Sequence, residues 1–266
     1  MQQSGYGSAG RKLLAVFAHP DDEGQIVGTM VKYASQGVEV FLVCATRGEM
    51  GTSTDPSLLA GVTMAQLRED ELRCACEVLG VKHLRFLNYH EGSFHRAGPS
   101  EVVAKLRGIM REFTPQVVIT FGPEGVYGHR DHVAVSRWTT STFYAFRQEC
   151  LSSRLQLPQK LYYTAYPRSL FDRLRSQGIE FTLDINGAIH KIEGVPDQKI
   201  TTVIDVSDYE SQKVAAFRCH RSQFRPGDLR SMIMQGTLME LLATERLVRV
   251  FPSGTGSDKI ETEMFE

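Results

Sequence analysis

Short apolar runs alternate with segments of helical spacing along the first half of this chain. The runs are nearly continuous in apolar residues, which is typical of strands buried on both faces of a sheet. The segments between them stop at Gly37, at Gly80 and before Pro115, where helices commonly end. We therefore expect an α/β fold, a mainly parallel sheet with helices on both faces in three layers. The predicted strands are residues 13–18, 38–45, 83–87 and 116–121, and the predicted helices are residues 26–36, 67–79 and 101–113.

The second half is expected to complete this sheet. Its predicted elements are helices at 131–147, 209–221 and 229–244 and strands at 160–166, 201–206 and 247–251. We expect one domain over residues 11–252, in which the last elements form a small C-terminal extension. The two ends, residues 1–10 and 253–266, are polar, and we predict that both are flexible tails.

Composition narrows the classes of partner. Of 266 residues, 42% are hydrophobic and 23% are charged, which is near the average for a globular domain. The formal net charge of -1 gives no general attraction to nucleic acid or to an anionic membrane, so neither is expected as a partner. No apolar stretch approaches the roughly 20 residues that cross a bilayer, and no basic segment followed by an apolar one opens the chain. We expect a cytoplasmic protein.

The cysteines are five, an odd number. Cys74 and Cys76 lie two residues apart on a predicted helix, so their side chains should point to different faces. We interpret all five as reduced thiols, and we expect neither a disulfide framework nor a zinc knuckle.

Two clusters of acids and histidines follow predicted strands. The first is residues 19–23, His-Pro-Asp-Asp-Glu, and the second is residues 128–132, Gly-His-Arg-Asp-His. Taken alone, each has an ordinary explanation as a turn or as acidic charge at a helix N-terminus. Because the carboxyl ends of parallel strands meet at one edge of a sheet, we expect the two clusters to share a crevice there.

These residue types suit metal-assisted hydrolysis. Zinc in hydrolases is commonly held by histidines and a carboxylate, with an open position where water becomes acidic enough to ionise near neutral pH. His19 and Asp22 lie three apart on a turn, and His129, Asp131 or His132 can supply a third ligand. Asp21 is then left as a base for the water.

The same residues belong to motifs that resemble those of the LmbE-like (PIG-L) zinc deacetylases. The matching segments are residues 18–23, Ala-His-Pro-Asp-Asp-Glu; 46–51, Thr-Arg-Gly-Glu-Met-Gly; 68–71, before Leu72; and 127–132, Tyr-Gly-His-Arg-Asp-His. They occur in the family's order over residues 12–150. The resemblance implies a Rossmann-like sheet and removal of acetyl groups from N-acetylglucosamine units of small glycoconjugates, such as precursors of mycothiol and bacillithiol.

Carried over by position, the resemblance also implies roles for single residues. It implies zinc bound by His19, Asp22 and His132, with Asp21 as the general base. It further implies that His129 stabilises the oxyanion or protonates the leaving amine, that Asp131 orients His129, that Tyr127 polarises the amide carbonyl, that Arg68 binds the sugar, and that Glu49 supports the site or the sugar.

The chain departs from the family after the third predicted strand. Relatives often carry an aspartate there that binds sugar hydroxyls, whereas this chain has Asn-Tyr-His-Glu-Gly at 88–92. Glu91 or His90 could make that contact. Residues 220–223, His-Arg-Ser-Gln, resemble a stretch found in many relatives, and we leave open whether they bind substrate or only close a helix under the site.

Other functions compete with this interpretation. Residues 5–10 fit the dinucleotide motif G-x-G-x-x-G, but they precede the first strand and so lack its context. Magnesium-dependent phosphate-ester hydrolysis is disfavoured by two histidines among the ligands. An amidase acting on thiol conjugates and a non-catalytic sugar- or metal-binding module stay open. We expect specificity in the loops at 50–63, 90–98 and 167–195, a small N-acetylated amino sugar as the partner, and a trimer or hexamer as relatives often form.

Overall fold

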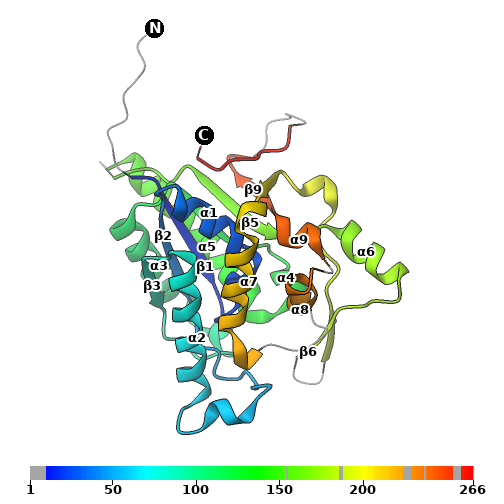
Figure 1. The fold of residues 1–266 in the computed structure, drawn as a ribbon. Helices are drawn as coiled ribbons and strands as arrows, with labels where there is room; N and C mark the ends of the chain where they lie inside the picture. The colour runs from blue at the N-terminus through cyan, green and yellow to red at the C-terminus, as the bar shows by residue number, and fades with distance from the viewer. Residues whose placement is uncertain are drawn as a thin grey trace.

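A seven-stranded sheet runs through the residues that the computed structural model describes, which are 10–153, 155–185, 188–223, 229–236, 238–253 and 259–265 (Figure 1). The strand order is β3-β2-β1-β4-β5-β9-β8. Neighbours from β3 to β5 are parallel, whereas β9 runs antiparallel to β5 and to β8. The strands are β1 (Lys12–Phe17), β2 (Glu39–Cys44), β3 (His83–Phe86), β4 (Val117–Phe121), β5 (Lys160–Ala165), β8 (Thr202–Asp205) and β9 (Thr244–Phe251).

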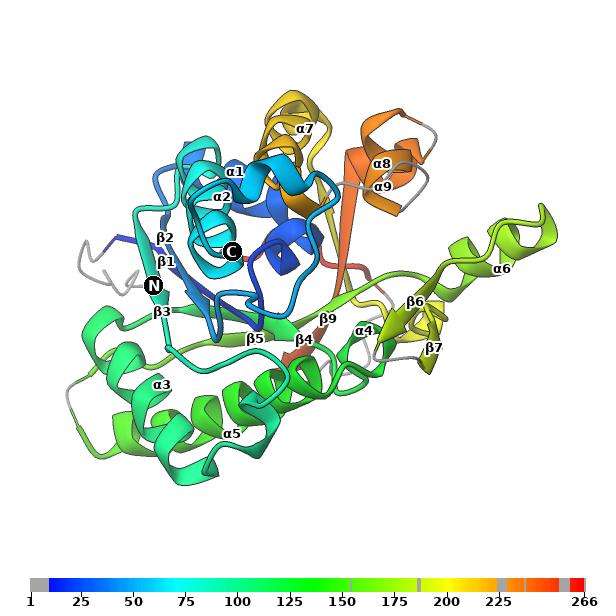
Figure 2. The same ribbon diagram turned by 90° about the horizontal axis from the view of Figure 1, so that it is seen from below.

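Helices cover both faces of the sheet. In Figure 2, α1 (Val27–Ser35), α2 (Met64–Leu79) and α7 (Glu210–Cys219) lie above it, and α3 (Pro99–Phe113) and α5 (Arg130–Leu151) lie below it. The central strands are therefore buried from both sides, as their continuous apolar sequences require. In β1, for example, Leu13 to Phe17 are each at most 1% exposed. The predicted three-layer α/β fold is confirmed.

The remaining helices and strands lie on the side of the molecule away from β3 (Figure 2). They are α4 (Gly125–Gly128), α6 (Arg168–Ser176), the hairpin of β6 (Thr182–Ile185) and β7 (Ala188–Lys191), α8 (Leu229–Met234) and α9 (Met239–Ala243). The sequence predicts no helix at α6, which lies inside a predicted loop. Its apolar side chains Leu170, Phe171 and Leu174 are buried against the body of the protein. The single helix predicted over 229–244 is wrong, because the chain turns at Gly236 with φ 73° and residue 244 already belongs to β9.

The prediction of a flexible tail over 253–266 is wrong for residues 259–265, which pack against the body of the protein. Glu261 pairs with Thr202 of β8 in a β-bridge, and Met264 is 1% exposed. The Glu261 carboxylate accepts hydrogen bonds from Lys160 and Tyr162 of β5. Buried partners thus fix a segment whose composition alone is typical of a tail. The predicted N-terminal tail, apart from Gly10, lies outside the described residues.

The prediction that all five cysteines are reduced is wrong for two of them. Cys74 of α2 and Cys219, the last residue of α7, form a disulfide with a Cα–Cα separation of 5.7 Å, within the range that a disulfide needs. Their sequence separation of 145 residues hides this proximity from any local pattern. Cys44, Cys76 and Cys150 are free and buried.

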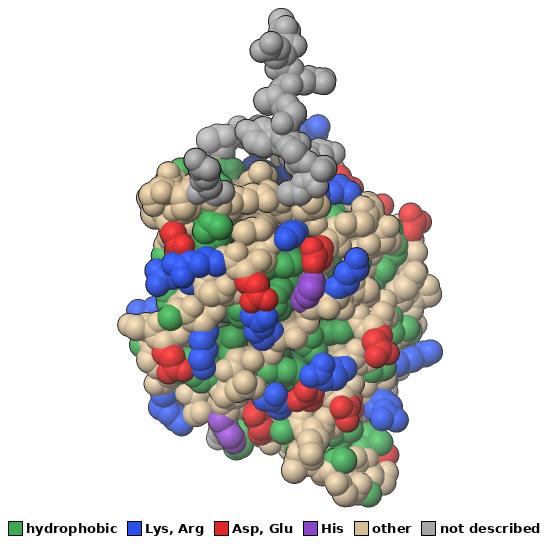
Figure 3. Space-filling view, turned by 90° about the vertical axis from the view of Figure 1, so that its left-hand side faces the viewer, with side chains coloured by type: hydrophobic (Ala, Val, Ile, Leu, Met, Phe, Trp, Pro, Cys, Tyr) green, Lys and Arg blue, Asp and Glu red, His purple; other side chains and the backbone are tan. Residues whose placement is uncertain are grey.

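The face beside the edge strand β3 carries charges of both signs (Figure 3). Arg85 on β3 pairs with Glu112, and His83 pairs with Glu39. Charged side chains discourage an edge strand from pairing with another chain. Because basic and acidic groups are mixed there, the described residues of this face form no continuous basic surface that would suit a nucleic acid. Among the helices of the described residues, none is long and apolar enough to span a bilayer.

Candidate metal centre and active site

The two predicted clusters meet at the carboxyl edge of the central strands. β1 pairs in parallel with β4, with Leu13 opposite Val117, so both strands end at the same edge. The chain that leaves β1 carries His19 two residues beyond Phe17. The chain that leaves β4 passes through α4 and enters α5, whose first turn carries His132. The topology thus brings residues more than a hundred positions apart into one site.

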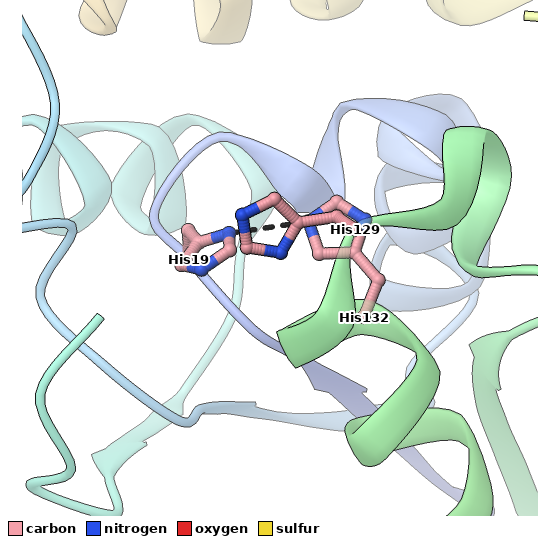
Figure 4. Close-up of side chains that lie close together, drawn as sticks. All are labelled: His19, His129 and His132. Atoms are coloured by element: carbon pink, nitrogen blue, oxygen red, sulfur yellow. Dashed lines mark hydrogen bonds between the residues drawn. The ribbon is translucent and has the colours of Figure 1, made fainter. Parts of the chain in front are cut away.

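His19, His132 and Asp22 present their ligand groups to one another there. His19 Nδ1 lies 3.1 Å from His132 Nε2, the contact drawn in Figure 4. The two Asp22 oxygens divide between the rings, with Oδ2 3.4 Å from His19 Nδ1 and Oδ1 3.3 Å from His132 Nε2. Ligands about 2.0 to 2.1 Å from a tetrahedral zinc ion are about 3.3 to 3.4 Å apart. The two ring nitrogens and the carboxylate thus form a triangle whose contacts have the spacing of a zinc site.

The His132 ring is fixed so that Nε2 faces this triangle. Its Nδ1–H donates to the Gly125 carbonyl at 3.2 Å, and the ring stacks on Phe121 at a centroid distance of 4.2 Å. Burial lowers the pKa of His132 to about 3, with a further contribution from the nearby His19 charge. Nε2 is therefore unprotonated at neutral pH, which is the form that binds a metal.

Carboxylates surround the His19 ring. Burial alone would lower the pKa of His19, but Asp131 and Asp22 raise it to about 10. Asp131 Oδ2 lies 3.5 Å from His19 Nε2, on the side of the ring away from the triangle. In metal sites a carboxylate in this place orients the ligating histidine and makes it a better donor.

Asp22 is held by the backbone of its own loop. Its Oδ2 accepts the His19 backbone N–H at 2.7 Å. Burial would raise the pKa of Asp22, but the neighbouring His132 and His19 lower it below its usual value. The carboxylate is therefore ionised and available as a ligand.

The buried Asp131 carboxylate contacts several groups and not one histidine alone. Its carboxylate accepts the backbone N–H groups of Gly92 and His95, and His95 Nδ1 lies 3.2 Å from Oδ1. Burial would raise the pKa of Asp131, but its contact with His19 and these hydrogen bonds lower it. The resemblance implies that Asp131 orients His129. The hydrogen bond between those two residues runs from the Asp131 backbone N–H to His129 Nδ1, while the carboxylate faces His19.

His129 lies beside the triangle. Its ring centroid is 4.8 Å from that of His19 and 4.7 Å from that of His132 (Figure 4). One nitrogen from each of the three histidines lies within 4.8 Å of the other two. Burial and the His19 charge lower the pKa of His129. The shorter distances to Asp22 favour that carboxylate over His129 as the third ligand. His129 is then available to act on a substrate.

Asp21 is held next to the ligands by Arg68. The Asp21 Oδ1 lies 3.3 Å from Arg68 Nη2, and the same guanidinium donates to the carbonyls of Pro20 and Gly48. Arg68 is only 4% exposed. The resemblance assigns this arginine to the sugar, but its described partners are the loop that carries Asp21, the loop after β2 and the Glu91 carboxylate, whose Oε2 lies 3.9 Å from Nη1.

Glu49 and Glu91 connect the loop after β2 to the loop after β3 through hydrogen bonds. Glu49 Oε2 accepts the Glu91 backbone N–H at 3.1 Å, and Glu91 Oε2 accepts the Met50 N–H at 2.8 Å. Glu91 also lies 3.8 Å from His19 Nε2. These acids, predicted to contact the sugar, thus reach the rim of the metal site.

Tyr127 packs edge-on against the site histidines. Its ring centroid lies 5.2 Å from that of His132 and 6.1 Å from that of His129. Burial raises the pKa of Tyr127 well above its usual value, and the charges of Asp22 and Asp21 add to the effect. The phenol is therefore neutral at physiological pH and can donate a hydrogen bond.

Three residues around the site have no role predicted from the sequence. His95 contacts the Asp131 carboxylate, Glu23 accepts the backbone N–H of Asp21, and His220 hydrogen-bonds Glu23. His95 lies in a loop predicted to set specificity. His220 lies in the stretch at 220–223 that resembles other family members, so a signal existed for it, but its partner is evident only in the fold.

Comparison with known proteins finds similar sequences. A family model described as GlcNAc-PI de-N-acetylase (PIG-L) matches residues 14–143. The 1D-myo-inositol 2-acetamido-2-deoxy-alpha-D-glucopyranoside deacetylase of Thermobifida fusca is 33% identical over 284 residues, which cover 96% of this chain and 99% of that protein.

Solved structures share the fold. The N,N'-diacetylchitobiose deacetylase from Pyrococcus horikoshii superposes with a TM-score of 0.63 at 24% identity, covering 91% of this chain and 84% of that one. The 4-carboxy-2-hydroxymuconate hydratase from Pseudomonas putida superposes with a TM-score of 0.67 at 19% identity, covering 94% of this chain and 100% of that one. A deacetylase and a hydratase with the same fold show that the fold does not decide the reaction, so function has to be inferred from the residues of the site.

Proposed function

The chain belongs to the PIG-L (GlcNAc-PI de-N-acetylase) family and is a hydrolytic N-deacetylase, and on this premise we propose that it removes the acetyl group from an N-acetylglucosamine unit of a small glycoconjugate, using a bound divalent metal, zinc, and Asp21 as the general base. The observation that carries the proposal is the triangle of His19 Nδ1, His132 Nε2 and the Asp22 carboxylate. Asp21 directly precedes Asp22 in the chain, and its carboxylate is held by Arg68.

The donor set fits zinc better than a harder cation. Two imidazole nitrogens and one carboxylate are a zinc-type set, whereas Mg²⁺ prefers oxygen ligands alone. When bound, the ion would supply Lewis acidity, lowering the pKa of a water molecule and polarising an acetamide carbonyl.

Asp21 takes up the proton of the attacking water. The neighbouring Arg68 fixes the direction of this carboxylate through the 3.3 Å contact. A positioned carboxylate of this kind contributes about 10² to 10⁴ to the rate.

His129 and Tyr127 act on the other side of the amide. Because burial and the His19 charge lower its pKa, His129 is neutral near neutral pH, and its ring N–H donates a hydrogen bond to the developing oxyanion. The proton that Asp21 takes from the water then passes to the leaving amine. Tyr127, neutral because its pKa is raised, donates a hydrogen bond to the developing oxyanion. Asp131 keeps the His19 ring in orientation, and Glu49 and Glu91 shape the rim that meets the sugar.

The substrate class follows from the sequence relatives. The Thermobifida fusca protein is named for a glucosaminide of inositol, and its similarity extends over 96% of this chain. We therefore propose N-acetylglucosaminyl-inositol as the substrate, handled by a single domain that extends from β1 to the packed residues 259–265. An amidase acting on thiol conjugates is the second candidate, because the same amide chemistry would serve it.

Acetate release tests the proposal. The zinc-loaded protein is assayed with free N-acetylglucosamine and with its inositol, malate and β-1,4-linked forms, beside Asp21→Asn and a magnesium-loaded sample. We expect release from the inositol form with zinc, reduced about 10²-fold or more in Asp21→Asn. Equal turnover by Asp21→Asn would remove Asp21 as the base. No release from any of these sugars, combined with cleavage of a thiol-conjugate amide, would favour the second candidate.

Metal content provides an independent test of the ligand set. His132→Ala should lose bound zinc when the protein is dialysed against buffer, because one corner of the triangle is gone. His95→Ala is the matched control, since it removes an imidazole near the site whose described partner is Asp131. Stoichiometric zinc in His132→Ala would exclude His132 as a ligand.

A further inference from the structure

The backbone of Asp21 has a conformation that needs outside support. Its φ of 96° lies in the left-handed region, which is unfavourable for a non-glycine residue because Cβ crowds the following carbonyl oxygen. Such residues persist only where their surroundings hold them, and they cluster at functional sites. The groups that hold Asp21 therefore bear on its chemistry.

Glu23 supplies that support from within the same loop. Its Oε2 accepts the Asp21 backbone N–H at 2.9 Å, across the turn that begins the short helix η1 (Asp22–Gln25). Glu23 is 2% exposed, so its carboxylate has little water with which to exchange this hydrogen bond. The family motif ends in this glutamate, and the described partners of its side chain are the Asp21 backbone and His220.

His220 fixes Glu23 in turn. Its Nε2 lies 2.6 Å from the other Glu23 oxygen, Oε1, and His220 is 1% exposed. His220 Nδ1 is buried without a hydrogen-bond partner among the described residues. The contact with Glu23 is thus the hydrogen bond that defines the direction of this ring, with Nε2–H as the donor.

The segment that carries His220 is fastened to α2. Cys219 is bonded to Cys74 on that helix, and Ser222 donates from its backbone N–H and its hydroxyl to Glu71, each at 2.7 Å. Helix α2 also carries Arg68, which holds Pro20 and Asp21. The Asp21 loop is therefore held by Arg68 directly and by His220 through Glu23, and both of these residues are attached to helix α2.

We propose that Glu23 and His220 are positioning residues, which hold the Asp21 backbone in its left-handed conformation and so direct the carboxylate that serves as the base. His220 lies outside the span of the family model, which ends at residue 143. The proposal rests on the assignment of Asp21 in the proposed function. It makes the C-terminal third of the chain part of the active site.

A double-mutant cycle tests this coupling. Glu23→Ala should lower kcat by about 10- to 10²-fold, the effect of a misplaced catalytic group, with KM and zinc content within about twofold of wild type. Glu23→Gln keeps an acceptor for the Asp21 N–H and should restore most of the loss. In an Asp21→Asn background, Glu23→Ala should change kcat by less than about twofold, because Glu23 acts through the missing carboxylate.

His220 is tested by a conservative pair and a control. His220→Leu removes the donor to Glu23 and should behave as Glu23→Ala, whereas His220→Gln keeps an N–H and should retain more activity. Should His220→Leu not fold, because it leaves a buried carboxylate unpaired, the double variant Glu23→Gln/His220→Leu removes that charge. Ser222→Ala removes only the hydroxyl donor to Glu71, while the backbone N–H at this position and the Cys74–Cys219 disulfide still fasten the segment, so it should lower stability and leave kcat near wild type.

The outcomes separate this proposal from the one on which it rests. Full activity in Asp21→Asn would overturn both. An inactive Asp21→Asn together with a Glu23→Ala effect of equal size in both backgrounds would overturn the positioning role alone. A crystal structure of Glu23→Ala gives a readout without substrate. Asp21 should leave the left-handed region, and an unchanged φ would contradict the proposal.

Discussion

Gly48 is the position where a single added methyl group should disturb the catalytic base. Its φ is 70°, and a Cβ built there would lie 2.1 Å from Arg68 Nη1 and 2.4 Å from Cζ. Arg68 is buried and donates to Pro20 and Gly48, so its guanidinium cannot move aside without breaking those hydrogen bonds. Gly48→Ala therefore displaces the group that holds Asp21.

The expected size follows from two contributions. A left-handed backbone costs an alanine roughly 1 to 2 kcal/mol, and losing a hydrogen bond from a buried charged group costs about 1.5 to 3 kcal/mol. Gly48→Ala should thus lose about 3 to 5 kcal/mol in free energy of unfolding. With Arg68 displaced from Asp21, kcat should fall by about 10- to 10²-fold.

Gly37→Ala is the matched control. Gly37 has a φ of 81°, and no described atom lies within 4 Å of the position that an added Cβ would take, so the variant bears only the backbone cost of roughly 1 to 2 kcal/mol. Chemical denaturation and acetate release are measured for both variants. A second check places Gly48→Ala in an Arg68→Ala background, where only the backbone cost should remain. Equal stability and activity of Gly48→Ala and Gly37→Ala would refute the reasoning.

Three further predictions concern stability and redox state. Lys213 and Glu245 form an ion pair with both side chains 3% exposed, and the Glu245 carboxylate also accepts the backbone N–H groups of Gly28 and Thr29. Lys213→Met should therefore cost about 3 kcal/mol, the lower end of the range for breaking a buried ion pair, because the carboxylate loses its charge partner and keeps these two hydrogen bonds; a thermal-unfolding midpoint equal to wild type would contradict this. Burial alone would raise the pKa of Glu261, but hydrogen bonds from Lys160, Thr202 and Tyr162 lower it. The stability that Glu261 contributes is therefore present above its unfolded pKa of about 4.3 and is lost as the pH falls below that value. In urea titrations, the difference in free energy of unfolding between wild type and Glu261→Gln should shrink as the pH is lowered. A difference that does not depend on pH would contradict this prediction. Alkylation of the denatured, unreduced protein should modify Cys44, Cys76 and Cys150 and spare Cys74 and Cys219, whereas modification of all the cysteines would show that the disulfide does not form.

The fold could be predicted because burial on both faces leaves a local signature. A continuous apolar run such as residues 13–18 has few alternatives to a central parallel strand, and the glycines at 37 and 80 mark helix ends in the sequence itself. Helix α6 has a local signal too, because Leu170, Phe171 and Leu174 lie on one helical face among charged residues, and the predicted loop at 167–195 overlooks it. The break between α8 and α9 depends on the turn at Gly236, which a periodic pattern overlooks.

The site could be predicted in part for a similar reason. The residues at 19–23 and 127–132 are contiguous motifs, and the topology of parallel strands says where they meet. The contacts of Asp131, Glu23 and Glu261 depend instead on which distant group arrives from another element. Arg68 illustrates the difference, because a motif predicts that an arginine stands at that position, and only the packing shows that its guanidinium is buried against the Asp21 loop.

The most direct test of the central claim is the position of the metal. Anomalous diffraction at the zinc edge from crystals grown with zinc should give one strong peak at this site, about 2.0 to 2.2 Å from His19 Nδ1, His132 Nε2 and an Asp22 oxygen. Asp21 should lie beside the ion without ligating it. A peak held by His129 in place of Asp22, or a peak bound through Asp21, would contradict the account.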